Sequence, residues 1–246
     1  MEFHFESGEV ILINKPLTWT SFDVVGKMRS IIRQRTGLRK IKTGHAGTLD
    51  PLATGLLILC TGKFTKRIDE FQGLEKEYTG TIRLGATTPS FDLETAIDKT
   101  YPITILTGSA MIQDAATHFV TTFDQVPPQF SAIKVDGKRA YKSARQDIGV
   151  EIKARKVTIS AFELTRIDLP DIDFRVVCSK GTYIRSLARD FGEFLNCGAH
   201  LTALCRTRIG PYHLRDAYEL TDLENLIPYT RDDSPKAINF LIHHGF

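Results

Sequence analysis

Segments with strand-like and helix-like apolar spacing follow one another along this chain in no regular order, and this mixture limits the folds that it can adopt. Short buried or alternating apolar runs predict strands at residues 10–13, 56–60, 78–84, 157–166, 174–178 and 201–209. Helical spacing predicts helices at 22–35, 65–71, 108–120, 182–195 and 220–226. A hairpin is predicted at 130–141 around Asp136-Gly137. Because strands and helices do not strictly alternate, the sequence predicts an α+β sheet protein.

The composition excludes several other classes. With 42% hydrophobic residues, 15 of them Phe, the chain can form a core and is not predicted to be disordered. The apolar run at 56–60 is far below the roughly 20 residues that cross a bilayer, and the acidic N-terminus lacks the layout of a signal peptide. The four cysteines form no CxxC pair. We therefore expect reduced thiols, no metal site and a cytoplasmic protein.

Positive charge is concentrated in two stretches, although the net charge of the whole chain is only +3. Nine Lys or Arg residues lie between Lys27 and Lys66, a window with one carboxylate, Asp50. Eight more lie between Lys134 and Lys156, whereas the chain after Leu214 is mostly acidic. Clustered positive charge is typical of nucleic-acid binding, and a solvated helix face is the alternative for any single run. Two runs together favour nucleic acid.

Residues 43–55 are predicted to form a structured loop that carries Asp50, and not a regular element. Glycines at 44, 47 and 55 permit backbone conformations closed to other residues and allow close approach of a ligand. Pro51 restricts Asp50 to extended conformations and so fixes the direction of its carboxylate. A single acid presented by a structured loop is often a catalytic group. The alternative is that Asp50 is only a turn residue before proline. The segment lacks the ending of a Walker phosphate-binding loop and has no second acid nearby of the kind that glycosidases use.

This loop resembles the catalytic motif of the TruB family of tRNA pseudouridine synthases. It reads Gly44-His45-Ala46-Gly47-Thr48-Leu49-Asp50-Pro51-Leu52-Ala53-Thr54-Gly55-Leu56-Leu57, with Ala46 where the family often has threonine. Four other blocks resemble motifs of that family in the same order: Ile13-Asn14-Lys15-Pro16 with residues 19–25, Lys76-Glu77-Tyr78 with Leu84-Gly85, 125–134 with 137–141, and 180–190 with 197–201. The resemblance extends from about Val10 to about Gly210.

The resemblance implies an α+β pseudouridine synthase catalytic fold, with a mixed, mostly antiparallel central sheet flanked by helices and loops and an RNA cleft across the sheet. It implies isomerisation of uridine 55 in the T arm of transfer RNA, by base flipping, cleavage of the C1′–N1 bond and formation of a C1′–C5 bond. This chemistry needs no cofactor and no metal. The expected partner is transfer RNA, without membrane or DNA. We expect a monomer, because no heptad seam is present.

The resemblance also implies roles for single residues. Asp50 is the catalytic carboxylate, and Arg185 is the arginine that pairs with it. Tyr78 stacks on the target base, and its hydroxyl helps to remove the C5 proton. Tyr183 and Leu204 belong to the uracil pocket.

Further predictions concern the rest of the RNA. The resemblance implies that His45 contacts the RNA and fills the space that the flipped base leaves. Exposed cations are expected to contact the phosphate backbone. The candidates are Arg29, Arg33, Arg39, Lys40, Lys42, Lys63, Lys66, Lys138 and Arg139.

The predicted organisation is a catalytic domain over residues 1–212 and a short acidic tail over 213–246, in place of the PUA module that many relatives carry. Two alternative functions stay open. One is a guide-RNA-dependent pseudouridine synthase of the same superfamily. The other is an RNA-folding chaperone that acts by binding alone.

Overall fold

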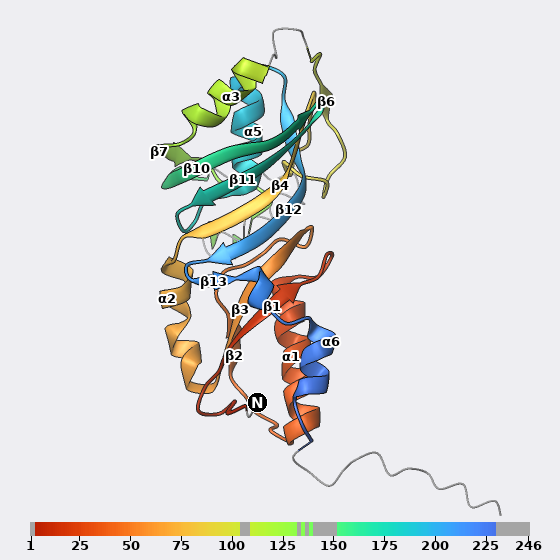
Figure 1. Ribbon diagram of the computed structural model, residues 1–246, viewed down its shortest axis with the longest axis vertical. Coiled ribbons are helices and arrows are strands. Elements are labelled where there is room, and N and C mark those ends of the chain that lie inside the picture. Colours follow the sequence, from red (N-terminus) through yellow and green to blue (C-terminus); the bar gives the residue numbers. More distant parts are fainter. Residues whose placement is uncertain (1–2, 104–108, 132–133, 136–137, 140–151, 230–246) are drawn as a thin grey trace, which may run out of the picture.

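Nine strands in the described part of the chain form one sheet that extends through both ends of the molecule (Figure 1). The computed structural model describes residues 3–103, 109–131, 134–135, 138–139 and 152–229. Along the sheet the order is β1 (Val10–Lys15), β3 (Ala53–Thr61), β12 (Ala199–Ile209), β4 (Lys76–Leu84), β11 (Asp171–Cys178), β10 (Arg155–Asp168) and β7 (Thr122–Gln125). At its margins β2 (Thr43–His45) pairs with β3, and β13 (Tyr212–His213) pairs with β12.

The junction between β3 and β12 joins the two ends of the molecule. This pair is parallel, with Leu204 opposite Ala53 and Arg206 opposite Gly55, whereas the other neighbours in the described sheet are antiparallel. The α+β fold with a mixed, mostly antiparallel sheet is therefore confirmed. Because β3 begins directly after the Asp50 loop, the parallel junction places that loop beside the middle of β12.

The lower end in Figure 1 has two cores on opposite faces of β1 and β3. Leu57 and Leu59 pack with α1 (Ser21–Thr36) and α6 (Leu220–Leu226), which lie side by side. Leu56 and Ile58 face the other way, toward η1 (Gly62–Arg67) and α2 (Ile68–Gly73). Successive side chains of a strand point to opposite faces, so a continuous apolar run indicates a strand covered on both sides.

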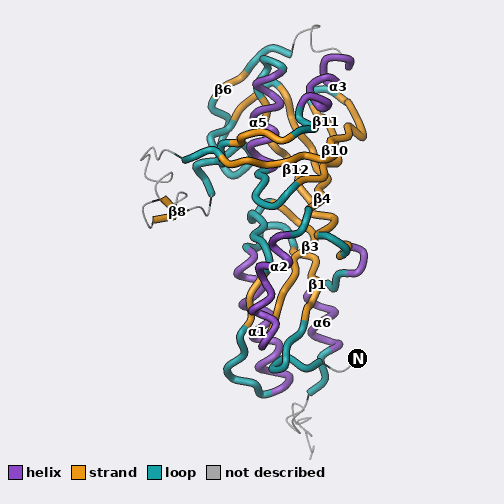
Figure 2. The backbone as a smooth tube through the Cα atoms, turned by 90° about the vertical axis from the view of Figure 1, so that its left-hand side faces the viewer, coloured by secondary structure: helices purple, strands orange, loops and turns teal. Residues whose placement is uncertain are grey.

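The upper end has helices on one sheet face and charged side chains on the other. The helices α3 (Ser109–His118) and α5 (Ile184–Phe194) pack on β4, β10, β11 and β12 around aromatic residues such as Phe162 and Phe191 (Figure 2). On the opposite face, Arg83 pairs with Asp171 at 2.7 Å. The backbones of Asp171 and Arg83 are also paired in the sheet. Strand β11 therefore begins at Asp171, three residues before the predicted strand at 174–178. Charged residues at the strand start concealed it from an apolar pattern.

The helices agree with the sequence predictions in type and differ at their ends. Helix α1 begins with a capping box in which the Thr20 hydroxyl accepts from the Asp23 amide and the Asp23 carboxylate accepts from the Thr20 amide. It ends at Gly37, whose φ of 71° is left-handed. The predicted helix at 65–71 is a 3₁₀ turn followed by α2. Within the described residues, no helix has the length and apolar content that crossing a bilayer requires.

The prediction that residues 43–55 form a structured loop and not a regular element is wrong at both ends. Residues 43–45 form β2, which pairs with β3, and Ala53 already belongs to β3. Both pairings join segments that a local pattern cannot connect. The hairpin predicted at 130–141 is present as the pair β8 (Lys134–Val135) and β9 (Lys138–Arg139), with its turn outside the described residues. A further short pair joins β5 (Ala86–Thr87) to β6 (Lys99–Thr100).

The first part of the acidic tail packs on the core. The Tyr218 amide donates to the Leu12 carbonyl at 2.9 Å, and Leu220 and Leu223 are buried with α1. Glu224 forms a salt bridge of 2.9 Å with Lys27. Residues 218–227 therefore share one core with β1 and α1, and part of their negative charge neutralises the basic helix.

We predict that Leu223→Ala costs about 2–4 kcal/mol of unfolding free energy, because it leaves a cavity between α6 and α1. Leu226→Ala on the same helix is the matched control, since Leu226 is 46% exposed and should change stability by less than about 0.5 kcal/mol. Urea unfolding at a fixed pH measures both. Equal effects of the two substitutions would contradict the packing of α6 described here.

Candidate active site

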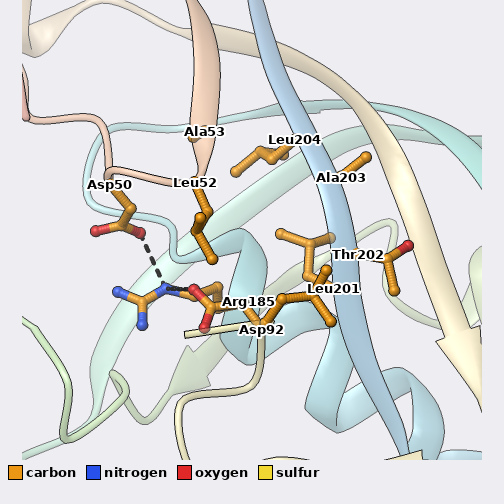
Figure 3. A pocket seen from close by; sticks show the side chains of 10 residues that line it. Asp50, Leu52, Ala53, Asp92, Arg185, Leu201, Thr202, Ala203 and Leu204 are labelled. Carbon is orange, nitrogen blue, oxygen red and sulfur yellow. Dashed lines mark ion pairs between the residues drawn. The ribbon is translucent and has the colours of Figure 1, made fainter. Parts of the chain in front are cut away.

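A cleft of about 720 Å³ crosses the sheet at the β3–β12 junction. Its floor and walls come from the Asp50 loop, α2, β4, β10, β12 and the turn before α5; the residues are Gly47, Thr48, Leu49, Asp50, Ala53, Asp69, Gln72, Gly73, Lys76, Tyr78, Arg155, Lys156, Ser179, Lys180, Gly181, Thr182, Tyr183, Ile184, Arg185, Leu204 and Arg206. A cavity of about 20 Å³ adjoins it and shares Asp50, Ala53, Arg185 and Leu204 (Figure 3). Asp50 thus lies where the two spaces meet.

The loop that carries Asp50 is held by hydrogen bonds from outside itself. The Leu49 amide donates to the Ser21 hydroxyl at 2.8 Å, and the Thr18 amide donates to the Pro51 carbonyl at 2.8 Å. Lys15, which is fully buried, donates to the Trp19 carbonyl at 2.6 Å and the Pro51 carbonyl at 3.4 Å. Burial lowers the pKa of this lysine to about 8, against the attraction of Asp50. These contacts come from the end of β1 and the residues that lead into α1. Residues 15–21, most of which belong to the motif around Asn14, therefore hold the Asp50 loop in place.

Gly55 is needed at the end of the loop because β12 approaches it closely. Its φ is +101°, and a Cβ there would lie 2.4 Å from the carbonyl oxygen of Arg206. Any larger residue would push β3 away from β12. The glycine therefore sets how near the loop comes to the cleft floor.

Arg185 brings the two carboxylates of Asp50 and Asp92 together. Its Nε lies 2.9 Å from Oδ2 of Asp50 and 3.5 Å from Oδ2 of Asp92, and both acids point toward it in Figure 3. Its remaining nitrogens donate to the carbonyls of Ser90 at 3.1 Å and Phe130 at 2.8 Å. The Arg185 side chain is 3% exposed, whereas that of Asp50 is 39% exposed. The acid faces the cleft and its partner lies behind it.

The charge state of Asp50 depends on opposing influences. Burial among protein atoms raises the pKa of its carboxyl, the Arg185 guanidinium lowers it, and the Asp92 carboxylate raises it. Arg185 is thus the group that favours the ionised form. Because the same guanidinium also pairs with Asp92, removal of Arg185 would leave two acids close together and unpaired.

Tyr78 and Leu204 reach the same cleft from adjacent strands. Tyr78 on β4 is 9% exposed, and Leu204 on β12 lies opposite Ala53 of β3. Burial raises the pKa of the Tyr78 hydroxyl, and the nearby Arg206 guanidinium opposes this. The structure therefore brings together four of the residues named from the sequence: Asp50, Arg185, Tyr78 and Leu204.

Tyr183 also lines the cleft, at the residue before α5. Its amide donates to the Gln125 side chain at 2.8 Å, and the Gln125 amide donates back to its carbonyl at 3.1 Å. The Arg155 guanidinium lies 4.8 Å from the centre of its ring. The backbone of Tyr183 is thus held by Gln125 of β7, and its ring is covered by Arg155 of β10.

His45 lies on β2 and does not line the cleft. Its Nδ1 is buried without a hydrogen-bond partner among the described residues. Burial lowers the pKa of this imidazole, and the charge of Arg206 acts in the same direction. The ring is therefore disposed to be neutral near pH 7.

The basic residues in the cleft are not those that the sequence nominated. The Arg29 guanidinium donates to the Thr43 carbonyl at 2.6 Å and so holds β2. Arg33, Arg39, Lys40, Lys42, Lys63 and Lys66 lie outside the cleft lining, and the side chains of Lys138 and Arg139 lie outside the described part of the chain. The cleft is instead lined by Lys76, Arg155, Lys156 and Lys180, besides Arg185 and Arg206.

Sequence reasoning missed Asp92 and Arg206. Asp92 lies in a segment between the recognised blocks, and Arg206 is one of two arginines in a strand that was read as apolar core. Their partners lie far away along the chain. For Arg206 the one available signal is a polar residue within an apolar strand, and the sequence offers no signal for Asp92. No cluster of three or more His, Cys, Asp or Glu side chains able to hold a metal occurs within the described residues.

Comparison with known proteins gives consistent matches. A model described as TruB family pseudouridylate synthase (N terminal domain) matches residues 33–184, and one described as tRNA pseudouridylate synthase B C-terminal domain matches 185–243. The chain is similar to proteins named tRNA pseudouridine synthase B from two bacteria. The one from Flavobacterium johnsoniae is 58% identical over 88% of this chain and 95% of the relative, and the one from Phocaeicola vulgatus is 58% identical over 87% of this chain and 90% of the relative.

Solved structures with the same fold include larger assemblies. A Cbf5-Nop10-Gar1 complex contains a chain with a TM-score of 0.68 and 29% identity, covering 90% of this chain and 55% of that one. An H/ACA RNP bound to a substrate RNA containing 2′-deoxyuridine contains one with a TM-score of 0.65 and 26% identity, covering 90% and 53%. This chain spans about half the length of those proteins.

We predict that Asp92→Asn lowers the pKa of Asp50, because it removes a like charge and leaves Arg185 to pair with Asp50 alone. Glu94→Gln is the control and should lower it less, since Glu94 has the weakest influence of the groups acting on Asp50. Carbon-13 NMR titration of the Asp50 carboxyl measures both. An unchanged or higher pKa in Asp92→Asn would refute the shared pairing.

Proposed function

The chain belongs to the TruB family of pseudouridylate synthases, and from this premise we propose how its cleft carries out the reaction. It is an isomerase that forms pseudouridine in transfer RNA. The observation that carries the proposal is the Asp50–Arg185 pair, in which the acid faces the cleft while the arginine is buried behind it. The substrate position proposed is uridine 55 in the T arm.

Asp50 is proposed as the group that acts on the sugar. The reaction breaks the C1′–N1 bond, turns the uracil and joins C1′ to C5, so the product contains the same atoms as the substrate. The carboxylate either adds to C1′ or removes the C2′ proton, and both routes start from the ionised acid. Arg185 supplies that form by stabilising the negative charge.

Tyr78 and Leu204 are proposed to hold the uracil while it turns. The Tyr78 ring offers a face for stacking, and Leu204 with Ala53 forms an apolar wall next to Asp50. After C1′ is joined to C5, that carbon still carries a proton that must leave. The Tyr78 hydroxyl is proposed to help remove it, directly or through water.

The target nucleotide must leave its helix to reach this cleft. A stacked uridine hides the bond that is broken, so the enzyme has to extrude it. Tyr183 is proposed as a further wall for the extruded base. His45, neutral and at the β2 edge, is proposed to contact the RNA where the base was.

Guide-RNA dependence is the second candidate, favoured by the likeness to chains in H/ACA assemblies. The named relatives at 58% identity support direct action on transfer RNA instead. A monomer is proposed as the active form. Activity of the purified protein on naked transfer RNA separates the two candidates.

We predict that Asp50→Asn lowers the rate of pseudouridine formation in a T-arm minihelix by at least about 10³-fold, because the reaction loses its carboxylate. Binding of the minihelix should remain within about threefold, since the RNA is held largely by other groups. Chemical mapping of pseudouridine and a binding titration measure the two effects. Asp114→Asn on the exposed face of α3 is the control. Normal turnover by Asp50→Asn would sink the assignment.

We predict that Lys156 and Lys180, exposed on the cleft wall, contact phosphates of the RNA. The double substitution Lys156→Gln and Lys180→Gln should weaken binding and reduce the slope of log affinity against log salt by about 1 for each lost contact. Lys99→Gln, an exposed lysine on β6 outside the cleft, is the matched control. An unchanged salt slope in the double variant would place the RNA backbone elsewhere.

A further inference from the structure

Arg206 is the largest fully buried side chain in the described structure, with 1% of its surface exposed. It lies in the middle of β12, opposite Gly55 of β3 on one side and Tyr78 of β4 on the other. Its position is thus between the strand that follows the Asp50 loop and the strand that carries the tyrosine. None of the roles proposed above uses it.

The guanidinium of Arg206 is bonded to both ends of the Asp50 loop. Its Nε donates to the Leu56 carbonyl at 2.8 Å, and its Nη2 donates to the Gly47 carbonyl at 3.1 Å. Gly47 comes before Asp50 and Leu56 comes after it. One planar group therefore spans the loop, which a lysine with a single ammonium cannot reproduce.

This cation is unusual because it is buried without an acid beside it. No salt bridge of Arg206 is found among the described residues, and its hydrogen-bond partners are the backbone carbonyls of Leu56 and Gly47 and the Tyr78 side chain. Burying an ionised group without an opposite charge is costly, so an apolar residue would be expected here if packing were the only requirement. Tyr78, which lines the same cleft, is the neighbour that the charge affects: the Arg206 guanidinium lowers the pKa of its hydroxyl, against the effect of burial.

We propose that Arg206 is a positioning residue that fixes the Asp50 loop relative to Tyr78, so that the groups acting on the sugar and on the base keep one separation. It is not proposed as a catalytic residue, because its hydrogen bonds hold the Asp50 loop and the Tyr78 side chain and none is assigned to the RNA. The expected effect of Arg206 on the rate of pseudouridine formation rests on the proposed function. The tie between the loop and β12 can be tested without RNA.

The first measurement is hydrogen exchange of the full-length protein without RNA. Arg206→Lys and Arg206→Met should make the amides of residues 46–55 exchange at least about tenfold faster, while the amides of α3 and β10 keep their rates. Arg208→Lys is the matched control. It lies two residues along β12 but pairs with Glu75 at 2.9 Å, beyond a register shift, away from the loop. Unchanged exchange at 46–55 in the folded variants would overturn the tie.

The second measurement is the single-turnover rate with saturating protein, next to the affinity for the RNA. Arg206→Lys should lower the rate by about 10²-fold with affinity kept within about threefold, because a small displacement of reacting groups is enough for such a loss. Arg208→Lys should keep both. Faster exchange with an unchanged rate would overturn the positioning role, as would equal losses of rate and affinity. If the wild-type protein formed no pseudouridine, the proposed function would fail while the exchange result still stood.

Discussion

The arrangement of the cleft depends on one buried arginine that is paired with two acids. Arg185 lies beneath Asp50 and is itself fixed by the carbonyls of Ser90 and Phe130, which come from two distant parts of the chain. Its burial removes the charge from water, and the carboxylates of Asp50 and Asp92 compensate it. These pairings hold the Asp50 loop, the segment after β5 and the start of α5 at one point.

The sheet provides the rest of the geometry. The parallel pairing of β3 with β12 places the Asp50 loop beside Leu204 and Arg206, and the antiparallel pairing of β12 with β4 adds Tyr78. Buried side chains from all three strands belong to shared hydrophobic cores, which support the strands on which these groups lie. A carboxylate, a phenol and an apolar wall thereby converge from residues spread over more than half of the chain.

The sequence predicted the fold class, most helices and strands, and residues that do meet in one cleft, because local patterns and family blocks hold that information. It did not predict Asp92 or Arg206, whose partners are 93 and 159 residues away. The charge runs located the cleft cations only in part: Arg155 and Lys156 end the second run, but Arg29 of the first run donates to the Thr43 carbonyl, and Lys180, outside both runs, lines the cleft. The positions of these residues depend on contacts between distant segments, which no local sequence period encodes.

The central claim is that this cleft isomerises a flipped uridine with the chain's own side chains. The most direct measurement is nucleotide-resolution mapping of pseudouridine in full-length transfer RNA after incubation with the purified protein alone. We predict one new pseudouridine, at uridine 55 of the T arm, formed without a guide RNA or an added protein. No pseudouridine, or pseudouridine only when a guide RNA or another protein is added, would contradict it.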